Sequence, residues 1–262
     1  MSLDRVGALR AERDAVVEFC RDLSAEEWAS PSRCEGWSVQ DVVAHMGAAY
    51  HGTFGLWVVK LMRSKDVEAG NDRDAELRRG WSPERVLREY ERWSKRFLAI
   101  GGLLQAPPMA SIPIRLAEVG TYPARMLASA LTFDHYLHLR YDLAGALARP
   151  VPPAGSGVLP VVLEWMWAGL PTMSGPALSW LSRSVTITLQ GPEGGTWSVV
   201  PTGGSGVKVV DCSVDDAAAR ITGDSETFPV WGTNREPWRE AALKIEGDED
   251  LATRLLDSMR II

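Results

Sequence analysis

The sequence predicts a mixed fold in which a four-helix bundle is followed by a smaller α+β domain. Apolar residues recur at helical spacing through the first half of the chain, whereas residues 184–222 contain stretches that alternate apolar and polar residues, as strands do. Between these regions, residues 149–157 read RPVPPAGSG, a composition that does not continue a helix. We therefore expect the bundle over residues 1–149, a linker over 150–157 and the α+β domain over 158–262.

The first two helices are indicated by an apolar stripe and by a capping motif. Apolar residues between Val6 and Leu23 recur at roughly helical spacing and predict the first helix. Ser38 and Asp41 have the spacing of a capping box, in which each side chain accepts a hydrogen bond from the backbone of the other residue. The second helix is therefore expected to begin near Ser38 and to end near Met62.

The third and fourth helices complete the expected bundle. Ser82 and Pro83 mark the start of the third helix, because proline is favoured at the first helical position. The fourth helix is expected from about Tyr122 to Leu147, after a proline-containing stretch over residues 107–113. Four long helices in sequence predict an antiparallel bundle.

The second half of the chain mixes helix and strand signals. Residues 161–169 indicate a buried helix, and residues 248–259 indicate a final helix. Strand candidates lie between them, where apolar residues alternate with polar ones or follow glycine-containing turns. These candidates are residues 184–190, 196–200, 206–210 and, as the weakest, 218–222.

The composition narrows the partners and the cellular location. The net charge is −6 and there is no block of consecutive basic residues, so nucleic acid is not expected as a partner. No window approaches about 18 uninterrupted apolar residues and the N-terminus lacks a secretory signal, so no membrane segment is expected. Cys20, Cys34 and Cys212 are scattered, which favours a reducing compartment over a disulfide framework. We expect a cytoplasmic protein.

Three polar residues fall on the core faces of two expected helices. His45 lies between Val42 and Ala49 on the apolar side of the second helix. Asp134 and His138 are four residues apart on the fourth helix and therefore lie on one face. A buried carboxylate is costly unless a cation or hydrogen-bond donors compensate it. A divalent metal held by His45, Asp134 and His138 would do so, and would leave coordination positions open for water or substrate.

The same residues also fit other interpretations. An aspartate and a histidine one turn apart can form a satisfied polar network without a metal. His135 is a second candidate ligand, although it points in a different direction from Asp134. Asp142 continues the stripe, either as a residue that supports a ligand or as the end of the helix in solvent. Asp41 is expected to cap its helix rather than to bind a metal.

Residues 32–45 read SRCEGWSVQDVVAH, with Trp28 shortly before them. This stretch closely resembles the opening signature of the mycothiol-dependent maleylpyruvate isomerase family, which belongs to the wider group of DinB-like metal-binding bundles. The fourth helix of that family carries an acid-x-x-x-His motif, and residues 134–138, DHYLH, match it with Asp134 in place of the usual Glu. The usual Asp three residues after the His is displaced by one position, to Asp142. The resemblance implies that His45, Asp134 and His138 bind one divalent metal.

The second half of the chain resembles the C-terminal domain of the same family, an α+β unit similar to sterol-carrier-like folds. Residues 230–235, VWGTNR, are similar to a Gly-Arg segment whose arginine is implicated in the active site. The resemblance implies a catalytic role for Arg235, whose guanidinium would hold a substrate carboxylate by a bidentate contact. A surface ion pair between Arg235 and Glu236 is the other interpretation of this arginine.

The resemblance also implies a reaction and a cosubstrate. Mycothiol would be the low-molecular-weight thiol, and the protein would be an isomerase or an S-transferase that acts on a small molecule. The ligand set suits zinc and is also compatible with nickel, iron, cobalt and manganese.

Two other functions stay open: a metal-dependent hydrolase on the same bundle, and a non-catalytic protein that holds an apolar ligand. The aromatic lining of such an apolar cavity would come from Trp165, Trp167, Trp180 and Trp231, together with Met166. The sequence does not predict the oligomeric state.

Overall fold

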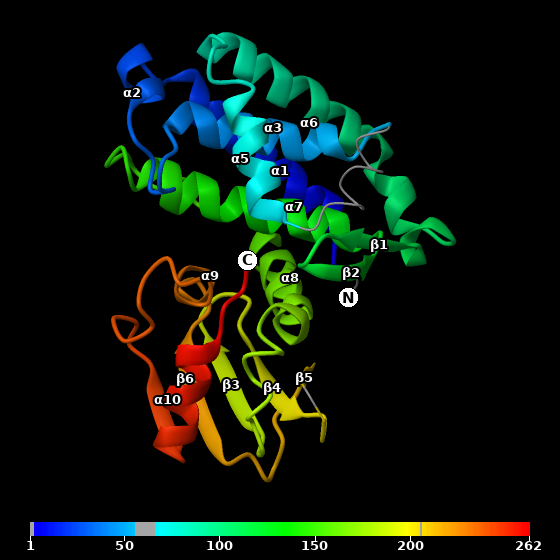
Figure 1. Cartoon of the computed structure of the whole chain (residues 1–262), viewed down its shortest axis with the longest axis vertical. Helices are drawn as coiled ribbons and strands as arrows, with labels where there is room; N and C mark the ends of the chain where they lie inside the picture. The colour runs from blue at the N-terminus through cyan, green and yellow to red at the C-terminus, as the bar shows by residue number, and fades with distance from the viewer. Residues whose placement is uncertain (1–2, 56–65, 205) are drawn as a thin grey trace. The chain divides into compact units, whose positions relative to one another are not determined.

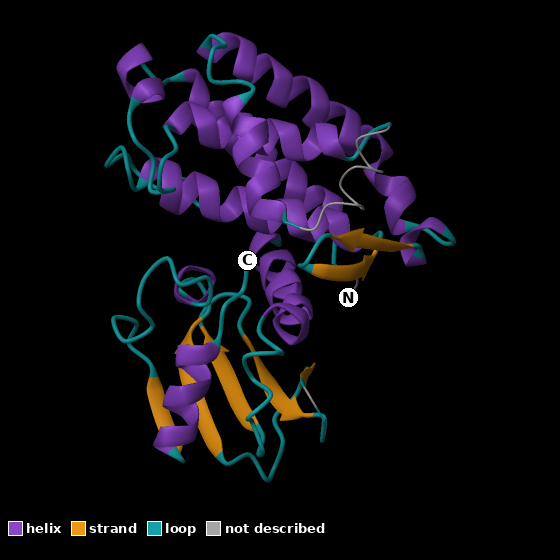
Figure 2. Ribbon diagram, viewed as in Figure 1, coloured by secondary structure: helices purple, strands orange, loops and turns teal. Residues whose placement is uncertain are grey.

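The computed structural model of the chain describes residues 3–55, 66–204 and 206–262. It divides into two compact units, residues 1–161 and residues 162–262. The first unit is mainly helical and the second contains a β-sheet, which confirms the predicted combination of a helical bundle and an α+β unit (Figures 1 and 2). None of the described helices is both long enough and apolar enough to cross a membrane.

The helical unit is built around four helices that pack against one another in pairs. In the described part of the chain its helices are α1 (Arg5–Arg21), α2 (Ala25–Ala29), α3 (Val39–Gly52), α5 (Val67–Glu76), α6 (Pro83–Gln105), the short 3-10 helix η1 (Met109–Ser111), α7 (Met126–Leu137) and the π-helix η2 (His138–Ala144). Helix α3 packs on α6 and α5, and α1 packs on α6 and α7. The buried residues between them include Leu9, Val42, Met46, Phe97 and Leu131. Each large apolar side chain buried in this way stabilises the fold by roughly 1.5–3 kcal/mol.

The start of α3 follows from its predicted capping box. The Ser38 hydroxyl accepts a hydrogen bond from the Asp41 backbone N–H, and the Asp41 carboxylate accepts one from the Ser38 backbone N–H. These bonds satisfy two of the N–H groups that a helix leaves unpaired at its N-terminus. The helix ends at Gly52, and the expected end near Met62 lies outside the described residues.

The expected fourth helix begins later than the sequence indicated. Tyr122 lies in strand β2 (Gly120–Pro123), which pairs with β1 (Pro113–Leu116) as an antiparallel hairpin. The Tyr122 hydroxyl donates a hydrogen bond to the Val119 carbonyl oxygen, 2.8 Å away, so this aromatic residue is buried within the hairpin rather than on a helical stripe. Helix α7 starts at Met126 and continues as η2 to Ala144.

Helix α5 has no counterpart among the sequence predictions. Its residues, VEAGNDRDAE, are mostly polar and carry no apolar stripe of useful length. It is held by tertiary contacts instead, because Ala75 is fully buried and Asp72 accepts a hydrogen bond from the indole N–H of Trp37. The sequence therefore lacked the periodic signal on which helix prediction depends.

The second unit contains a sheet with the strand order β5-β4-β3-β6-β7 among the described residues. Its elements are β3 (Val185–Gln190), β4 (Gly195–Pro201), β5 (Val207–Val210), β6 (Ala219–Asp224), the short helix α9 (Phe228–Trp231), β7 (Lys244–Gly247) and α10 (Glu249–Ser258). The pairing of β3 with β6 is parallel and the other pairings are antiparallel. Helix α10 packs against β6 and β7.

The four predicted strands are present, whereas β7 was not predicted. Helix α8 (Val158–Met173) contains the boundary between the two units and matches the predicted buried helix.

Candidate metal centre

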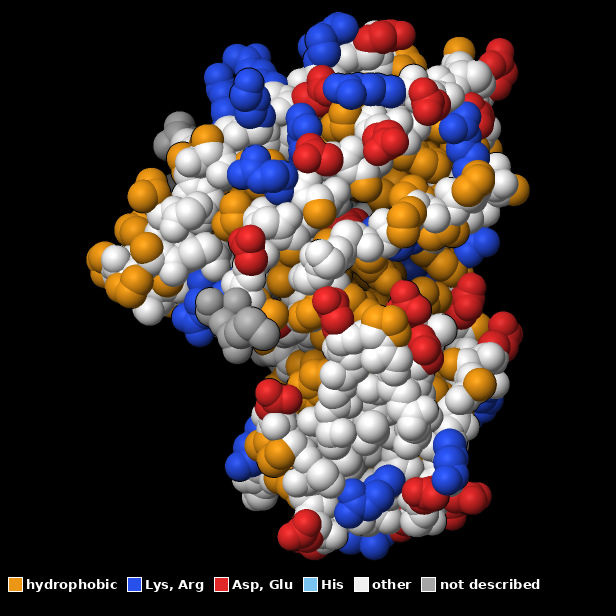
Figure 3. Space-filling view, turned by 180° about the vertical axis from the view of Figure 1, so that it is seen from behind, with side chains coloured by type: hydrophobic (Ala, Val, Ile, Leu, Met, Phe, Trp, Pro, Cys, Tyr) orange, Lys and Arg blue, Asp and Glu red, His pale blue; other side chains and the backbone are white. Residues whose placement is uncertain are grey.

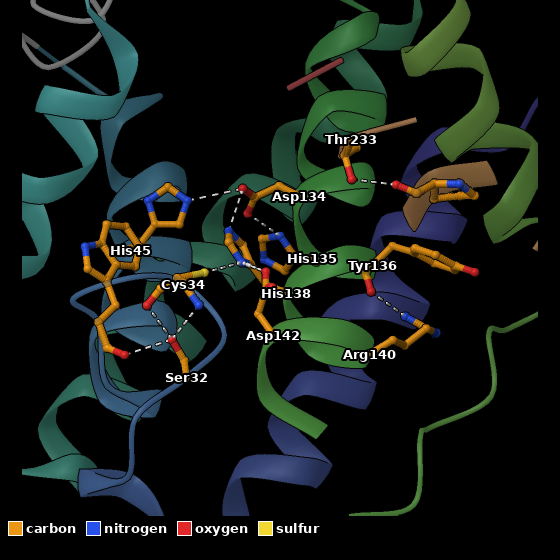
Figure 4. A network of polar contacts seen from close by, with 12 residues as sticks. Ser32, Cys34, His45, Asp134, His135, Tyr136, His138, Arg140, Asp142 and Thr233 are labelled. Atoms are coloured by element: carbon orange, nitrogen blue, oxygen red, sulfur yellow. Dashed lines mark hydrogen bonds and ion pairs between the residues drawn. The ribbon is translucent and has the colours of Figure 1, made fainter. Parts of the chain in front are cut away.

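The three predicted ligands come together in the helical unit (Figure 4). His45 projects from α3, Asp134 from α7, and His138 from the first residue of η2. Nε2 of His45 lies 3.2 Å from Asp134 Oδ1, and Nε2 of His138 lies 3.4 Å from the same oxygen. One donor atom from each residue lies within 4.8 Å of the other two. The arrangement therefore presents two nitrogens and one oxygen toward a common point.

These distances agree with the geometry of a tetrahedral metal site. Zinc binds histidine nitrogen and carboxylate oxygen at about 2.0–2.2 Å, which places neighbouring ligand atoms about 3.3–3.5 Å apart at tetrahedral angles. The separations of 3.2 and 3.4 Å around Asp134 Oδ1 are close to that value. The three residues present therefore fit one small divalent ion.

Burial gives a second reason to expect a cation here. The side chains of His45 and His138 are 7% and 11% exposed, and that of Asp134 is 25% exposed. The other carboxylate oxygen, Asp134 Oδ2, is buried and has no hydrogen-bond partner, although His135 Nδ1 lies 3.3 Å away. A buried carboxylate oxygen without a donor is costly, and a nearby positive charge offsets that cost.

The cluster perturbs the pKa values of its own members. Burial by itself raises the pKa of the Asp134 carboxyl, but the charges of His138 and His45 outweigh burial and hold this pKa well below its ordinary value. Burial lowers the pKa of His138, but Asp134 and Asp142 outweigh it and hold the pKa well above its ordinary value. Without a metal, a proton on His138 therefore supplies the positive charge that Asp134 requires.

Asp142 supports His138 from the opposite side of the imidazole ring. Its Oδ2 lies 2.8 Å from Nδ1 of His138, and its side chain is 3% exposed. A carboxylate in this position fixes the tautomer of a ligand histidine, because the N–H at Nδ1 leaves the lone pair at Nε2 for a metal. The sequence left two interpretations open for Asp142. Its burial and its contact with His138 favour a residue that orients this histidine over a solvated helix end.

Two residues beside the cluster were not predicted to belong to it. Cys34 Sγ lies 3.9 Å from His138 Nδ1, and the Trp37 ring lies 5.3 Å from the His45 ring, centroid to centroid. Both stand in the loop before α3, within the stretch that resembles the family signature. Proximity in the sequence to His45 was the only available signal, because the loop conformation that turns them toward His138 and His45 is a tertiary feature.

Of the other residues considered in the sequence, His135 adjoins the cluster, with Nδ1 3.3 Å from Asp134 Oδ2, whereas His51 and Asp41 have other surroundings. His135 is fully buried between the rings of Tyr50 and Tyr90, at centroid distances of 5.0 and 5.6 Å. His51 stacks on Trp93 and so leaves the face of α3 that carries His45. Asp41 caps α3, as expected, and also accepts a hydrogen bond from Arg79.

Arg235 belongs to the second unit, where it follows α9. Its backbone N–H donates a hydrogen bond to the Val230 carbonyl oxygen over 3.0 Å, and the residue is partly buried. The catalytic role implied for Arg235 by the sequence stays a prediction.

Comparison with known proteins gives a consistent result. The family described as the mycothiol maleylpyruvate isomerase N-terminal domain matches residues 9–144, slightly more than half of the chain. Two similar crystal structures are those of a mycothiol-dependent maleylpyruvate isomerase and of its mutant with one histidine changed to alanine. At 12% sequence identity, each match covers 93% of this chain and 96% of the other, with TM-scores of 0.59 and 0.60 respectively. A search of curated proteins found no match.

The structural similarity extends over both units and shows a shared fold. The family match is confined to the helical unit, and its range contains the whole cluster of His45, Asp134, His138 and Asp142. The family takes its description from an enzyme, which agrees with the predicted enzymatic class. The chain belongs to the mycothiol maleylpyruvate isomerase N-terminal domain family.

Proposed function

We propose that the protein is a metal-dependent enzyme that uses the low-molecular-weight thiol mycothiol as a cosubstrate to isomerise a small molecule. The observation that carries this proposal is the position of Asp134 Oδ1, which lies within 3.4 Å of an imidazole nitrogen from each of two segments. The family and the two similar structures support the choice of reaction, because both structures are described as mycothiol-dependent maleylpyruvate isomerase. Maleylpyruvate or a related carboxylate-bearing compound is the proposed substrate.

His45, Asp134 and His138 would hold one divalent ion, for which zinc is the proposed identity because of the two nitrogens and one oxygen. Three protein ligands leave an open position of the kind that catalytic zinc sites keep for water or substrate. When bound, the ion would supply a positive charge that lowers the pKa of a nearby thiol and so favours its nucleophilic thiolate form near neutral pH.

Two neighbouring residues would orient the histidine ligands around the open coordination position. Asp142 holds the His138 ring so that Nε2 faces Asp134 and His45. Trp37 packs on the His45 ring and is itself held by the hydrogen bond from its indole N–H to Asp72. This aromatic side chain excludes water from one side of His45 and restricts the rotation of the imidazole.

In the proposed isomerisation, the thiolate adds to an activated cis double bond of the substrate. One C–S bond forms, and the former double bond becomes a single bond that rotates. Elimination of the thiolate then restores the double bond as the trans isomer, so the thiol is not consumed. Arg235 is proposed to hold a substrate carboxylate by a bidentate contact. In an S-transferase the adduct would instead be retained as the product.

The free cysteines fit a thiol-dependent enzyme in a reducing environment. Cys20, Cys34 and Cys212 are all free thiols, as is typical of proteins in reducing compartments. We therefore infer a cytoplasmic location, where a low-molecular-weight thiol stays reduced.

Two alternatives make different predictions. A metal-dependent hydrolase would use the same three ligands and would need no thiol. A non-catalytic protein would hold an apolar ligand among the aromatic residues of the second unit. There, Trp167 stacks on Trp197 and on Phe228, with ring centroids 5.0 and 4.7 Å apart. Because these rings pack on one another, they favour a core role over the lining of a cavity.

The proposal is tested by elemental analysis of freshly purified protein, followed by assays with and without mycothiol. We expect about one metal ion per chain and turnover that requires both the metal and the thiol. Chelation should abolish turnover, and zinc should restore it. Turnover without any thiol would favour the hydrolase, and turnover that survives chelation would contradict a metal-dependent enzyme. His51→Ala is the matched control, because His51 stacks on Trp93 outside the cluster.

A further inference from the structure

The His138 ring has a second group of metal-binding atoms on its other side. Nδ1 of His138 lies 2.8 Å from Asp142 Oδ2 and 3.9 Å from Cys34 Sγ (Figure 4). One donor atom from each of these three residues lies within 4.8 Å of the other two, as in the group formed by His45, Asp134 and His138. The two groups share the His138 ring and approach different nitrogens of it.

We propose that Cys34, His138 and Asp142 form a second metal-binding site, which takes a thiophilic cation such as Cd²⁺ or Cu⁺. Its ligand set contains a sulfur, whereas the first set contains only nitrogen and oxygen. Soft cations prefer thiolate, and imidazole and carboxylate complete a mixed site. On binding, the cation replaces the proton of the Cys34 thiol, which is released to the solvent.

The loop that carries Cys34 is fixed against η2 by bonds that do not involve the thiol. The backbone N–H of Arg33 donates to the Asp142 carbonyl oxygen over 3.2 Å, and the Arg33 guanidinium lies over the Tyr141 ring at 4.3 Å. The backbone N–H of Cys34 donates to Ser32 Oγ over 3.1 Å. Cys34 is therefore held beside His138 before any ion arrives, and ligand preorganisation of this kind lowers the cost of binding.

The geometry requires only a small adjustment. The present distance of 2.8 Å between His138 Nδ1 and Asp142 Oδ2 is that of a hydrogen bond, whereas two ligand atoms on one ion stand about 3.3–3.5 Å apart. Replacing the bridging proton, which would leave to the solvent, by an ion would open this pair by about half an ångström. Sulfur and nitrogen ligands on zinc stand about 3.5–3.6 Å apart, so Cys34 Sγ, now at 3.9 Å, would move inward by roughly 0.3–0.4 Å for an ion of that size and by less for a larger one.

The two sites exclude one another at His138. A neutral imidazole carries one N–H and one lone pair, so it binds an ion through only one nitrogen. The first site needs the lone pair at Nε2 with the N–H toward Asp142, and the second site needs the lone pair at Nδ1. The chain should therefore bind one ion through His138 at a time, with the softness of the metal selecting the side of the ring.

The remaining cysteines differ from Cys34 in their surroundings. Cys20 is buried in the apolar core, where burial raises the pKa of its thiol to about 12. Cys212 is exposed. Neither belongs to a cluster of metal-binding donors among the described residues. Cys212→Ser is therefore a matched control that removes an accessible thiol without altering the proposed site.

The test is a titration of the metal-free protein with Cd²⁺, followed by the ultraviolet charge-transfer band of a cadmium–thiolate bond. The wild-type protein and Cys212→Ser should develop the band and saturate at one equivalent, and Cys34→Ser should lose it. His45→Ala should keep the band, because it disrupts only the first site. Circular dichroism and zinc binding by Cys34→Ser check that this variant folds.

A measurement on the unmutated chain gives an independent answer. Cd²⁺ should protect Cys34 from alkylation by iodoacetamide, with the modified residue identified by mass spectrometry, whereas Cys212 should stay reactive. A charge-transfer band that persists in Cys34→Ser, or an unprotected Cys34, would overturn the proposal. Loss of the band in His45→Ala would also overturn it, because the sulfur site would then depend on the first one. Two cadmium ions bound through His138 would overturn the mutual exclusion. The proposed enzymatic function is tested separately by its own assays with zinc and thiol.

Discussion

His45 Nε2 lies 3.2 Å from Asp134 Oδ1, although 89 residues separate the two positions along the chain. One residue belongs to α3 and the other to α7, and His138 completes the group from the turn that follows Asp134. The contact places a carboxylate beside two largely buried imidazoles in the helical unit. On the outer surface, by contrast, acidic and basic side chains lie interspersed over the face drawn in Figure 3. The expected consequences of this cluster can each be measured.

Removing a ligand should remove the metal. We expect His45→Ala and His138→Ala to lower the metal content of the purified protein from about one ion per chain toward zero. The loss of affinity should exceed the roughly 10- to 100-fold effect that is typical of losing a residue that only supports a ligand. Elemental analysis and competition with a chelator measure it. Unchanged metal content in both variants would contradict the assignment of these histidines.

Removing the support of His138 should have a smaller effect. In Asp142→Asn, the acceptor of the hydrogen bond from His138 Nδ1 becomes a neutral amide. Affinity for zinc should fall by about 10- to 100-fold, because the ring loses its fixed tautomer and some basicity. Asp4→Asn is a suitable control, since Asp4 caps α1 and belongs to neither group of metal-binding donors. Equal losses in the two variants would argue against a specific role for Asp142.

The stability of the metal-free protein should depend on the protonation of His138. The raised pKa of His138 reflects mainly Asp134 and Asp142, which together outweigh burial. Its contribution to the free energy of unfolding is fully present below the unfolded pKa of about 6.5, and is lost as the pH rises through the folded pKa. The lowered pKa of Asp134 has the opposite pH dependence. Its contribution to the free energy of unfolding is present above the unfolded pKa of about 3.9, and is lost as the pH falls through the pKa in the folded protein.

The measurement is the melting temperature of chelated wild-type protein and of His138→Gln across this pH range. The melting temperature of the wild type should exceed that of His138→Gln by most in mildly acidic solution, and this difference should shrink as the pH rises into the alkaline range. An advantage that grows with pH would contradict the charged pair. With zinc bound, the difference in melting temperature should instead grow as the pH rises, because zinc binding requires His138 to lose its proton.

The N-terminal cap of α3 positions His45 indirectly. Ser38→Ala removes the hydroxyl that accepts from Asp41 N–H, and this should destabilise the protein by ~0.5–2 kcal/mol. The melting temperature should fall by a few degrees, about 2–4 °C per kcal/mol. Ser38→Thr is the conservative control and should restore most of the stability. No change in melting temperature for Ser38→Ala would show that the cap contributes little here.

Arg235 offers a test of the second unit. If its guanidinium holds a substrate carboxylate, Arg235→Ala should lower kcat/KM by about 10- to 150-fold, which corresponds to the ~1.5–3 kcal/mol of a hydrogen bond to a charged group. Metal content should not change, because the clustered ligands all belong to the first unit. Arg235→Lys should recover only part of the activity, since lysine lacks the bidentate geometry. Full activity in Arg235→Ala would exclude this role.

The sequence alone determined the class of the fold and the identity of the clustered residues. Helical periodicity, the capping box at Ser38 and the alternation around Ile187 are local patterns, so they report local structure directly. His45, Asp134 and His138 were recognisable because polar residues interrupted apolar stripes and because their surroundings resembled a known family. Helix α5 and the β1–β2 hairpin were not recognisable, because their residues depend on tertiary contacts for stability.

Only the tertiary structure determined how the cluster is completed. Spacing placed Asp142 one turn beyond His138 but left its role open, and the approach of Cys34 does not follow from spacing along the chain. The His138–Asp142 contact lies within η2, where the helix widens, and the approach of Cys34 depends on the backbone bond between Arg33 and Asp142 that brings the loop alongside η2. Contacts between distant segments form only when the core closes around them. A linear pattern can therefore name the residues that bind a metal before it can show which neighbours support or compete with them.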